Sequence, residues 1–469
     1  MTAENVAVRA ASTPAELTGR VVRPVDDDYA VARRSWNELF SHRPRVIVYA
    51  QTTQDVVTAL AWARWHDVPV RVRSGGHCLE GWSTVDDGVV IDVSEMKSAA
   101  IDPAAGTATV GAGLNQLEAV TALGAAGFVA PTGTEGSVGL VGATLGGGFG
   151  LLTRPFGMAS DNLLAAEVVV ASGDTGAEVL AVDENDHADL LWALRGAGNG
   201  NFGIVTSLTY AIHPVAQAIY VTANWTGLGD LVEVFDTWQR SAPGADRRLT
   251  SQLEIHGDAI SLIGVLVSDS EAEALELLAP VLSIGTPVVT ATAGSWADTY
   301  AGFQLPTEDE PANWKFTSQF MTQPFPVEAI EVVRSFMTTA PTADCNYFTN
   351  AFGGAVVDGE PSGGSVFAHR DALFYAEPGA GWGARGADPG PDGDALTATC
   401  LAWVADFSRA LAPFANGAYV NVPNADAEDW AEQYWGRGVE RLRRVKAAYD
   451  PDGVFTYAQS VPPARDPSS

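Results

Sequence analysis

The chain has 469 residues, of which 46% are hydrophobic and 18% are charged, a composition typical of a globular protein with material for two or three domains. The chain has 27 lysines and arginines and 57 aspartates and glutamates, so the formal net charge is 27 − 57 = −30. This charge repels phosphate backbones and anionic lipid surfaces, and no stretch approaches the roughly 18 consecutive apolar residues of a membrane span. We therefore expect a soluble protein that has neither nucleic acid nor a membrane as a partner.

The cysteine and histidine content also limits the function classes. Cys78, Cys345 and Cys400 are too few for a disulfide framework, and the N-terminus lacks the basic start and apolar run of a signal peptide. We therefore expect a cytoplasmic location. The chain has no HExxH motif, no histidine cluster and no paired Cys/His spacing, so we expect no metal site.

In chain order, the first elements place a histidine on a loop. Thr52 and Asp55 resemble a capping box and predict a helix to about residue 66. Valines then alternate with polar residues over 68–73, which predicts a half-buried strand, and His77 follows it after two glycines. Further strands are predicted at 88–94, 106–113, 163–173, 176–182 and 201–215, with a helix at 187–194.

The pattern changes after residue 213. Strands are predicted at 218–225, 248–257 and 259–268, and helices at 230–242, 271–283 and 327–338. The Gly/Pro/Asp-rich stretch 377–394 is typical of a surface loop, and 426–450 predicts a charged helix. We interpret these elements as an α+β protein with two main domains, 1–213 and 214–415, followed by a returning segment, 416–461, and a tail, 462–469.

Two glycine-rich stretches resemble ligand-binding loops. Gly198, Gly200 and Gly203 fit a dinucleotide fingerprint as a string, but a helix precedes them and a strand follows, which is the wrong order. The stretch 130–150 has a glycine at about every third position. Structural turns explain some of these glycines, whereas backbone wrapped around a flat or pyrophosphate-bearing ligand explains the whole run better.

By itself His77 has two interpretations. It is an ordinary loop histidine that donates to a backbone carbonyl, or an imidazole that the two glycines leave accessible to a ligand. The sequence contains no GxSxG motif, which weakens an acyl-transfer function.

Taken together, the motifs resemble the berberine-bridge-enzyme-like branch of the vanillyl-alcohol-oxidase, or PCMH-type, flavoproteins. The resemblance rests on "RSGGH" at 73–77, "GTEGSVGLVGATLGGGFG", "DLLWALRGAGNGNFGIVTSLTY", "FAHR" at 367–370, "AYVNVPN" and "YDPDGVFTYAQSV". It implies a PCMH-type FAD-binding domain beside a substrate domain whose antiparallel sheet is covered by helices. It also implies that His77 bonds covalently to the 8α-methyl of FAD. The implied cofactor-binding residues are Arg73, Ser74, Gly75, Gly76, His77, Gly81, Gly133, Thr134, Ser137, Val138, Gly139, Gly142, Ala143, Gly147, Ile204 and Asn421.

The sequence departs from the family pattern at two positions. Many relatives carry a second tether, a cysteine in G-T-C-x-x-V-G, where this chain has Glu135. A carboxylate cannot form a thioether, so we predict a single covalent bond. Plant-type members often end Y-x-N-Y with a tyrosine that accepts a proton, whereas here Val422 follows Asn421, so the base must lie elsewhere or the reaction needs none beyond water.

The resemblance implies a two-electron oxidation of a small organic substrate, such as an alcohol, sugar, phenol or amine, with dioxygen reduced to hydrogen peroxide. Our hypothesis for the catalytic residues is Glu254, on a polar strand face, with Tyr419 and Asn421 near the flavin ring. Glu254 facing solvent is the alternative. Other functions left open are a dehydrogenase with a quinone or protein acceptor, an oxidative cyclase of secondary metabolism, and a non-catalytic flavin- or carbohydrate-binding protein. The sequence assigns no oligomeric state.

Overall fold

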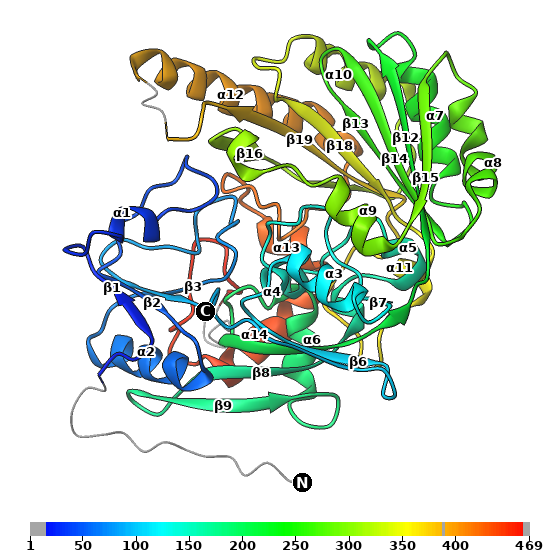
Figure 1. Cartoon of the computed structure of the whole chain (residues 1–469). Helices are drawn as coiled ribbons and strands as arrows, with labels where there is room; N and C mark the ends of the chain where they lie inside the picture. Colours follow the sequence, from blue (N-terminus) through cyan, green and yellow to red (C-terminus); the bar gives the residue numbers. More distant parts are fainter. Residues whose placement is uncertain (1–15, 387–389, 463–469) are drawn as a thin grey trace.

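The computed structural model describes residues 16–386 and 390–462, and the chain folds into two lobes (Figure 1). The N-terminal residues on which the signal-peptide prediction rests fall mostly outside the described residues, as does the tail after 462. Among the described residues, no helix has both the length and the apolar character that crossing a bilayer requires.

The lower lobe begins with a four-stranded mixed sheet in the order β1 (Arg20–Val22), β2 (Val46–Tyr49), β4 (Val89–Asp92), β3 (Val70–Arg73). The strands β2, β4 and β3 run parallel to one another. The predicted helix before β3 is confirmed as α2 (Thr53–Trp65), and Thr52 and Asp55 form both halves of its capping box. The predicted strand ends at Arg73, so His77 lies on the loop that leaves β3.

A five-stranded antiparallel sheet completes the lower lobe. Its order is β5 (Ala99–Asp102), β6 (Thr107–Gly111), β10 (Ile204–Ala211), β8 (Leu163–Ser172), β9 (Gly176–Val182). The other elements of this region are short or lie between the strands: α1 (Tyr29–Ala32), α3 (Gln116–Gly124), β7 (Phe128–Val129), α4 (Leu140–Leu145), α5 (Thr153–Phe156), η1 (Ser160–Asn162), α6 (Ala188–Ala197) and β11 (His213–Pro214).

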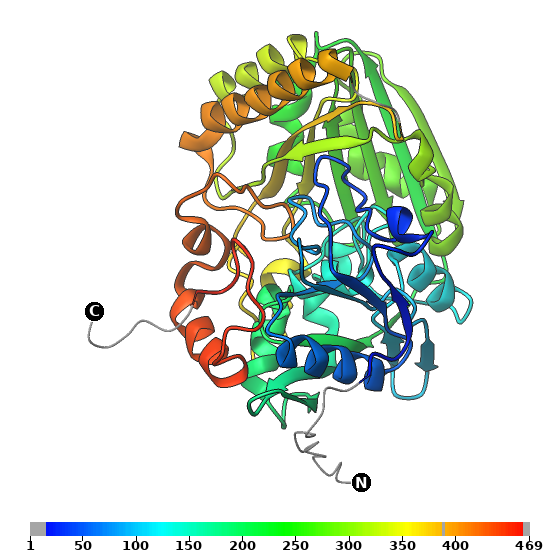
Figure 2. The ribbon, with the colours of Figure 1, turned by 90° about the vertical axis from the view of Figure 1, so that its left-hand side faces the viewer.

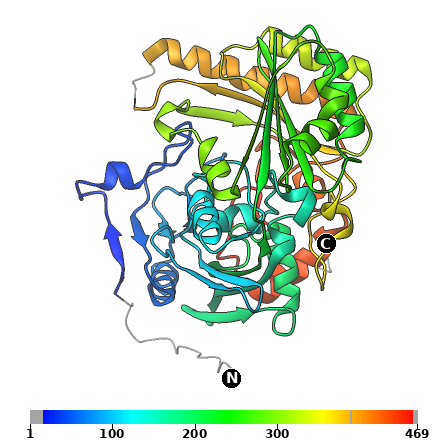
Figure 3. The same cartoon turned by 45° about the vertical axis from the view of Figure 1, so that its right-hand side comes forward.

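The upper lobe is built on an antiparallel sheet with helices on one face, as predicted. Its strand order is β15 (Val288–Gly294), β12 (Ala218–Thr226), β14 (Ala259–Leu266), β13 (Leu249–Ile255), β18 (Asn346–Ala351), β19 (Phe374–Trp382), β16 (Asn313–Phe316), with β17 (Gln319–Met321) also paired to β19. Figure 3 shows this sheet above the lower lobe. The helices pack on it through one apolar core: α7 (Leu231–Ser241), α8 (Glu271–Leu282), α10 (Val327–Thr338) and α12 (Gly390–Leu411).

The prediction of a surface loop over 377–394 is wrong for most of these residues. Residues up to Trp382 belong to β19, which lies between β18 and β16, and α12 begins at Gly390. The glycines have a packing role, because a Cβ at Gly379 would collide with Asn346 and Phe316, and one at Gly381 would crowd the ring of Trp314. Glycine content that is typical of a loop here makes space for aromatic rings. Residues 387–389 lie outside the described residues.

The last segment returns to the lower lobe, where α13 (Trp430–Trp435) and α14 (Val439–Tyr449) pack (Figure 2). Tyr434, Trp435 and Leu442 are buried in the same apolar core as the two lower sheets. The prediction of one continuous helix over 426–450 is wrong: Gly436 has φ +48°, and a turn, η4 (Gly436–Gly438), separates the two helices. Short elements link the lobes: α9 (Trp296–Gly302), η2 (Thr307–Asp309), α11 (Ala355–Asp358) and η3 (Ala412–Phe414).

Candidate functional site

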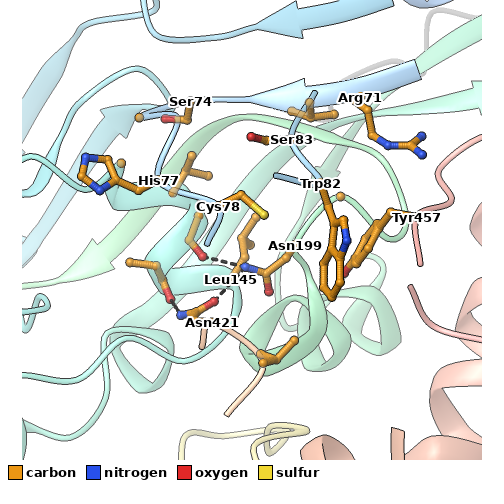
Figure 4. A pocket seen from close by; sticks show the side chains of 18 of the residues that line it. Arg71, Ser74, His77, Cys78, Trp82, Ser83, Leu145, Asn199, Asn421 and Tyr457 are labelled. Atoms are coloured by element: carbon orange, nitrogen blue, oxygen red, sulfur yellow. Dashed lines mark hydrogen bonds between the residues drawn. The ribbon is translucent and has the colours of Figure 1, made fainter. Parts of the chain in front are cut away.

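A deep cavity runs through the lower lobe where the two sheets, α4 and the C-terminal segment meet. The cavity volume is about 250 Å³, and the cavity opens to solvent. Figure 4 shows His77 at one side of this cavity, Trp82 and Tyr457 at the other, and Cys78 and Asn199 between them. The cavity is large enough for an extended ligand of several linked groups.

Close backbone contact between two loops builds the wall beside His77. A Cβ at Gly75 would collide with the backbone of Gly139, and a Cβ at Gly139 would collide with Gly75 in return. Gly76 has φ +73°, a conformation that side chains other than glycine rarely adopt. The loop after β3 and the loop before α4 therefore approach each other as only glycines permit, and together they present main chain to the cavity.

The imidazole of His77 is uncharged at neutral pH. Burial, together with the nearby positive charge of Arg385, lowers its pKa to about 3. One ring face stacks on Trp36 with the centroids 4.8 Å apart and the planes 22° from parallel. A neutral, held imidazole keeps a lone pair for bonding, which is the state that a nucleophilic histidine requires.

The lining fits a ligand that has both a flat ring and many polar groups. Side chains at Gly142 and Gly200 would project into open space, so these glycines leave room in the cavity. The buried oxygens Ser83 Oγ and Asn199 Oδ1 have no hydrogen-bond partner among the described residues, although both residues line the cavity. Because buried polar atoms are nearly always satisfied, these oxygens indicate hydrogen bonds that a bound molecule completes.

Many of the residues proposed for cofactor binding do lie together. The cavity is lined by Ser74, Gly75, Gly76, His77, Val138, Gly139, Gly142, Ala143 and Asn421. Others lie outside this lining: Arg73, Gly81, Gly133, Thr134, Ser137, Gly147 and Ile204. Membership of a glycine-rich motif therefore does not by itself place a residue at the cavity.

Arg73 and the 133–136 loop lie outside this lining and bond to other parts of the protein. The guanidinium of Arg73 is buried, forms an ion pair with Asp92 and donates to the carbonyl of Ala32. The Tyr300 hydroxyl donates to Gly133 O at 2.9 Å, and Gln252 Nε2 donates to Thr134 Oγ1 at 3.0 Å. These bonds fasten the glycine-rich loop of the lower lobe to residues of the upper lobe.

Several lining residues were not assigned from the sequence. They include Arg71, Cys78, Leu79, Trp82, Ser83, Asn199, Gly200, Gly203, Val205, Tyr434, Phe455, Thr456, Tyr457 and Gln459. The signal for some was present, because Asn199 and Gly200 belong to the stretch that fails as a dinucleotide fingerprint. The C-terminal "VFTYAQ" motif contains four more, Phe455, Thr456, Tyr457 and Gln459, although the sequence analysis gave its residues no role.

Tyr419 and Asn421 connect the cavity to the upper lobe. Asn421 Nδ2 donates to Ala143 O and to the Tyr419 hydroxyl, each at 2.8 Å, and Asn199 Nδ2 donates to Asn421 Oδ1 at 3.0 Å. Tyr419 lies outside the cavity lining, where burial raises its pKa above the usual value. Its ring packs edge-on against Tyr375 of β19, with centroids 5.8 Å apart.

Two carboxylates lie on the face of the upper sheet that bears Tyr375. Glu254 of β13 is directly opposite Phe348 of β18, and Phe348 is directly opposite Glu377 of β19, so all three side chains share one face. The neighbouring row holds Tyr375 and Gln252, and Gln252 bonds to Thr134 of the lower lobe. This face, which we call the polar sheet face, therefore looks toward the lower lobe.

The pKa values of the two carboxyl groups are shifted in opposite directions. Burial raises the pKa of Glu377 to about 7, with a further increase from the charge of Glu254, although a hydrogen bond from the Tyr375 hydroxyl lowers it. Burial also raises the pKa of Glu254, but the hydrogen bond and charge of His256 and the amide of Asn346 outweigh it and hold that pKa below the usual value. Sequence reasoning missed Glu377 because it falls in the stretch interpreted as a loop.

Comparison with known proteins identifies the family. Residues 44–176 match the family model described as "FAD binding domain", and residues 418–462 match "Berberine and berberine like". The FAD-linked oxidoreductase YgaK of Bacillus subtilis (strain 168) is 37% identical over 455 residues, which cover 96% of this chain and 98% of the relative. The chain belongs to the berberine-bridge-enzyme-like family of FAD-linked oxidoreductases.

Other members of this family support the same assignment. The (R)-6-hydroxynicotine oxidase of Paenarthrobacter nicotinovorans is 32% identical over 243 residues, 52% of this chain and 49% of that protein. Among solved structures, Physcomitrella patens BBE-like 1 superposes with a TM-score of 0.87 over 96% of this chain and 98% of the other, at 24% identity. The PCMH-type fold that the sequence motifs implied is confirmed, and FAD is the cofactor that the cavity accommodates.

Proposed function

We propose that the protein is an oxidase whose FAD is bonded to His77 and which removes two electrons from a small organic substrate, with dioxygen reduced to hydrogen peroxide. Bound FAD supplies the two-electron acceptor, whereas the chain supplies placement and proton handling. The domains that we propose, 1–213 with 416–461 for FAD and 214–415 for substrate, put the substrate between the cavity and the polar sheet face.

The tether proposal is supported by the surroundings of His77. The residue lines the cavity, its ring plane is held by Trp36, and its low pKa keeps the imidazole neutral. The resemblance in "RSGGH" adds the precedent for the bond. Glu135 stands where relatives have a second, cysteine tether, so we propose one covalent bond only.

The observation that carries the catalytic proposal is a series of contacts from the cavity to a carboxyl group, in which ring packing, and not a hydrogen bond, joins Tyr419 to Tyr375. Asn421 lines the cavity and bonds to Tyr419, the Tyr419 ring packs on Tyr375, and the Tyr375 hydroxyl donates to Glu377. A carboxyl with a pKa of about 7 is matched to accepting a proton near neutral pH. We therefore propose Glu377 as the base in place of Glu254.

Glu254 has a different part in this scheme. Its lowered pKa keeps it charged at neutral pH, which makes it a weaker proton acceptor but a source of negative charge beside Glu377. Paired carboxyl groups whose environments separate their pKa values commonly divide the roles of proton carrier and fixed charge. Tyr419 and Asn421 hold the cavity wall in place, because the Tyr419 hydroxyl accepts from a backbone amide and from Asn421 Nδ2, and Asn421 also bonds to main chain and to Asn199.

An oxidase function is also supported by the relative named (R)-6-hydroxynicotine oxidase. For the location we propose the cytoplasm, because Cys78, Cys345 and Cys400 are all free thiols in the structure. The substrate itself depends on side chains from several strands, so a panel of alcohols, sugars, phenols and amines is the appropriate probe.

The test is anaerobic mixing of the purified protein with each compound of the panel while flavin absorbance is followed. The proposal predicts that at least one class bleaches the oxidised flavin band, and that admitting air restores the band with one hydrogen peroxide formed per substrate oxidised. Bleaching that air does not reverse, but a quinone does, would show a dehydrogenase. No bleaching by any class would favour a binding protein.

A further inference from the structure

A column of four aromatic rings crosses from His77 into the upper lobe. His77 stacks on Trp36, Trp36 stacks on Trp314 with centroids 6.2 Å apart and planes 11° from parallel, and Trp314 stacks on Phe316 at 5.0 Å and 11°. The last two rings belong to β16, at the edge of the upper sheet. The position of the histidine ring is therefore coupled by stacking to the opposite lobe.

Trp36 and its neighbour Asn37 are bonded to the histidine loop on both sides of His77. The Trp36 amide donates to Gly76 O at 3.0 Å, and Asn37 Nδ2 donates to Leu79 O at 2.8 Å. The same Asn37 amide donates to Trp314 O at 2.8 Å, and Trp314 N donates to Asn37 Oδ1 at 3.0 Å. Residues 36–37 thus form a strap that fixes the His77 loop to β16.

The indole of Trp36 is anchored at its edge as well. Its Nε1 donates to Glu310 Oε2 at 2.5 Å, and the Arg385 guanidinium lies over its ring with Cζ 5.5 Å from the centroid. Arg385 also donates to the Trp36 carbonyl at 2.8 Å. A ring held at its face, its edge and its main chain has little freedom, so it offers His77 a fixed surface.

Stacking occupies the face of an imidazole and leaves both ring nitrogens, which lie in the plane, free to react. A bond to a methyl carbon forms along that plane, and misplacing the reacting atom by about 1 Å is enough to cost roughly a hundredfold in rate. The strap therefore holds the imidazole by its face, which the bond-forming reaction does not use.

We propose that Trp36 is a positioning residue for the attachment of FAD to His77. The inference rests on the proposed tether. In the attachment, the new N–C bond replaces the imidazole N–H bond and one C–H bond of the 8α-methyl. The two protons and two electrons released pass to dioxygen, the oxidant, which becomes hydrogen peroxide, so the step balances.

The experiment compares the wild type, Trp36→Leu and Trp36→Phe in the full chain, each prepared without FAD and then incubated with FAD in air. Two quantities are measured: total FAD in the native protein, and FAD that stays with the chain after acid denaturation. The loss of the ring in Trp36→Leu is expected to slow attachment during incubation with FAD in air at least about tenfold, with native FAD binding retained. Trp36→Phe, which can still stack, is expected to stay close to wild type.

Two further variants complete the design. Trp403→Leu is the matched control, since it removes a buried indole of α12 that packs on Phe336 and Phe407, away from His77, and is expected to attach FAD normally. If Trp36→Leu does not give folded protein, Trp36→Met serves in its place, because it keeps apolar bulk without a ring.

The outcomes separate the two proposals. Wild-type attachment in Trp36→Leu or Trp36→Met overturns the role of Trp36 and leaves the tether intact. Parallel loss of total and covalent FAD, or equal loss in Trp36→Phe, shows a structural role only and also overturns it. A wild-type chain that carries no FAD after denaturation contradicts the tether itself.

Discussion

The two walls of the proposed active site are built by different means. The cofactor wall in the lower lobe depends on main chain, since Gly75 and Gly139 touch and Gly142 faces open space. The polar sheet face of the upper lobe depends on side chains, with Glu254, Phe348 and Glu377 contributed by three adjacent strands. In the proposed active site, cofactor binding thus depends on short local motifs, and substrate chemistry depends on residues that are distant in sequence.

The strongest way to test that contrast is to change the proton acceptor without touching the cofactor wall. Glu377→Gln keeps an acceptor for the Tyr375 hydroxyl but cannot take a proton, so kcat is expected to fall about 10²–10³-fold while FAD content stays normal. Stopped-flow flavin reduction measures the effect directly. A reduction rate within a factor of two or three of wild type would remove Glu377 from the mechanism.

The pH profile sharpens the same assignment. A base works in its deprotonated form, so kcat/KM of the wild type is expected to rise with pH through about 7 and then level off. The profile of Glu377→Gln should lose this inflection and stay flat at its low value. An inflection that persists unchanged in Glu377→Gln would assign the titration to another group.

A change on the cofactor wall should weaken FAD binding and leave the proton acceptor in place. In the His77→Ala background, where FAD binds without a bond, Gly142→Val fills open space of the cavity and is expected to weaken FAD binding about tenfold or more, with the melting temperature of the apoprotein little changed. Fluorescence titration gives the dissociation constant. Gly229→Val, which also meets open space but lies outside the cavity lining, is the control, and equal affinity in both variants would disprove the assigned wall.

The smallest expected effect concerns the interaction between the two carboxylates. The charge of Glu254 raises the pKa of Glu377, so Glu254→Gln is expected to move the kcat/KM inflection to lower pH and to change the plateau rate less than Glu377→Gln does. If Glu254→Gln instead abolishes the reaction as fully as Glu377→Gln, the original hypothesis that Glu254 is the base regains support.

The sequence predicted the lower lobe better than the upper one, for a physical reason. The capping box at Thr52, the alternating valines of β3 and the "RSGGH" motif are local signals, and each has its structural counterpart. Glu377 was missed because Pro378 and the neighbouring glycines are typical of a loop, whereas the strand uses them to admit the rings of Phe316 and Trp314. That packing is set by β16, about 60 residues away in the chain, and no local pattern reports it.

Arg73 illustrates the same limit inside a correct motif. Its neighbours Ser74 to His77 line the cavity, yet its own side chain turns into the lobe to pair with Asp92. Alternation along a strand predicts which side a residue takes, but not what the two sides contact. The residues that a motif contains and the residues that bind the ligand are therefore overlapping sets.

The most direct test of the whole account is the intact mass of the wild-type chain after acid denaturation, beside that of His77→Ala. The account predicts one FAD per wild-type chain and none in the variant, which should still bind FAD in its native form. An unmodified mass for wild-type protein that is yellow when native would contradict the bond to His77.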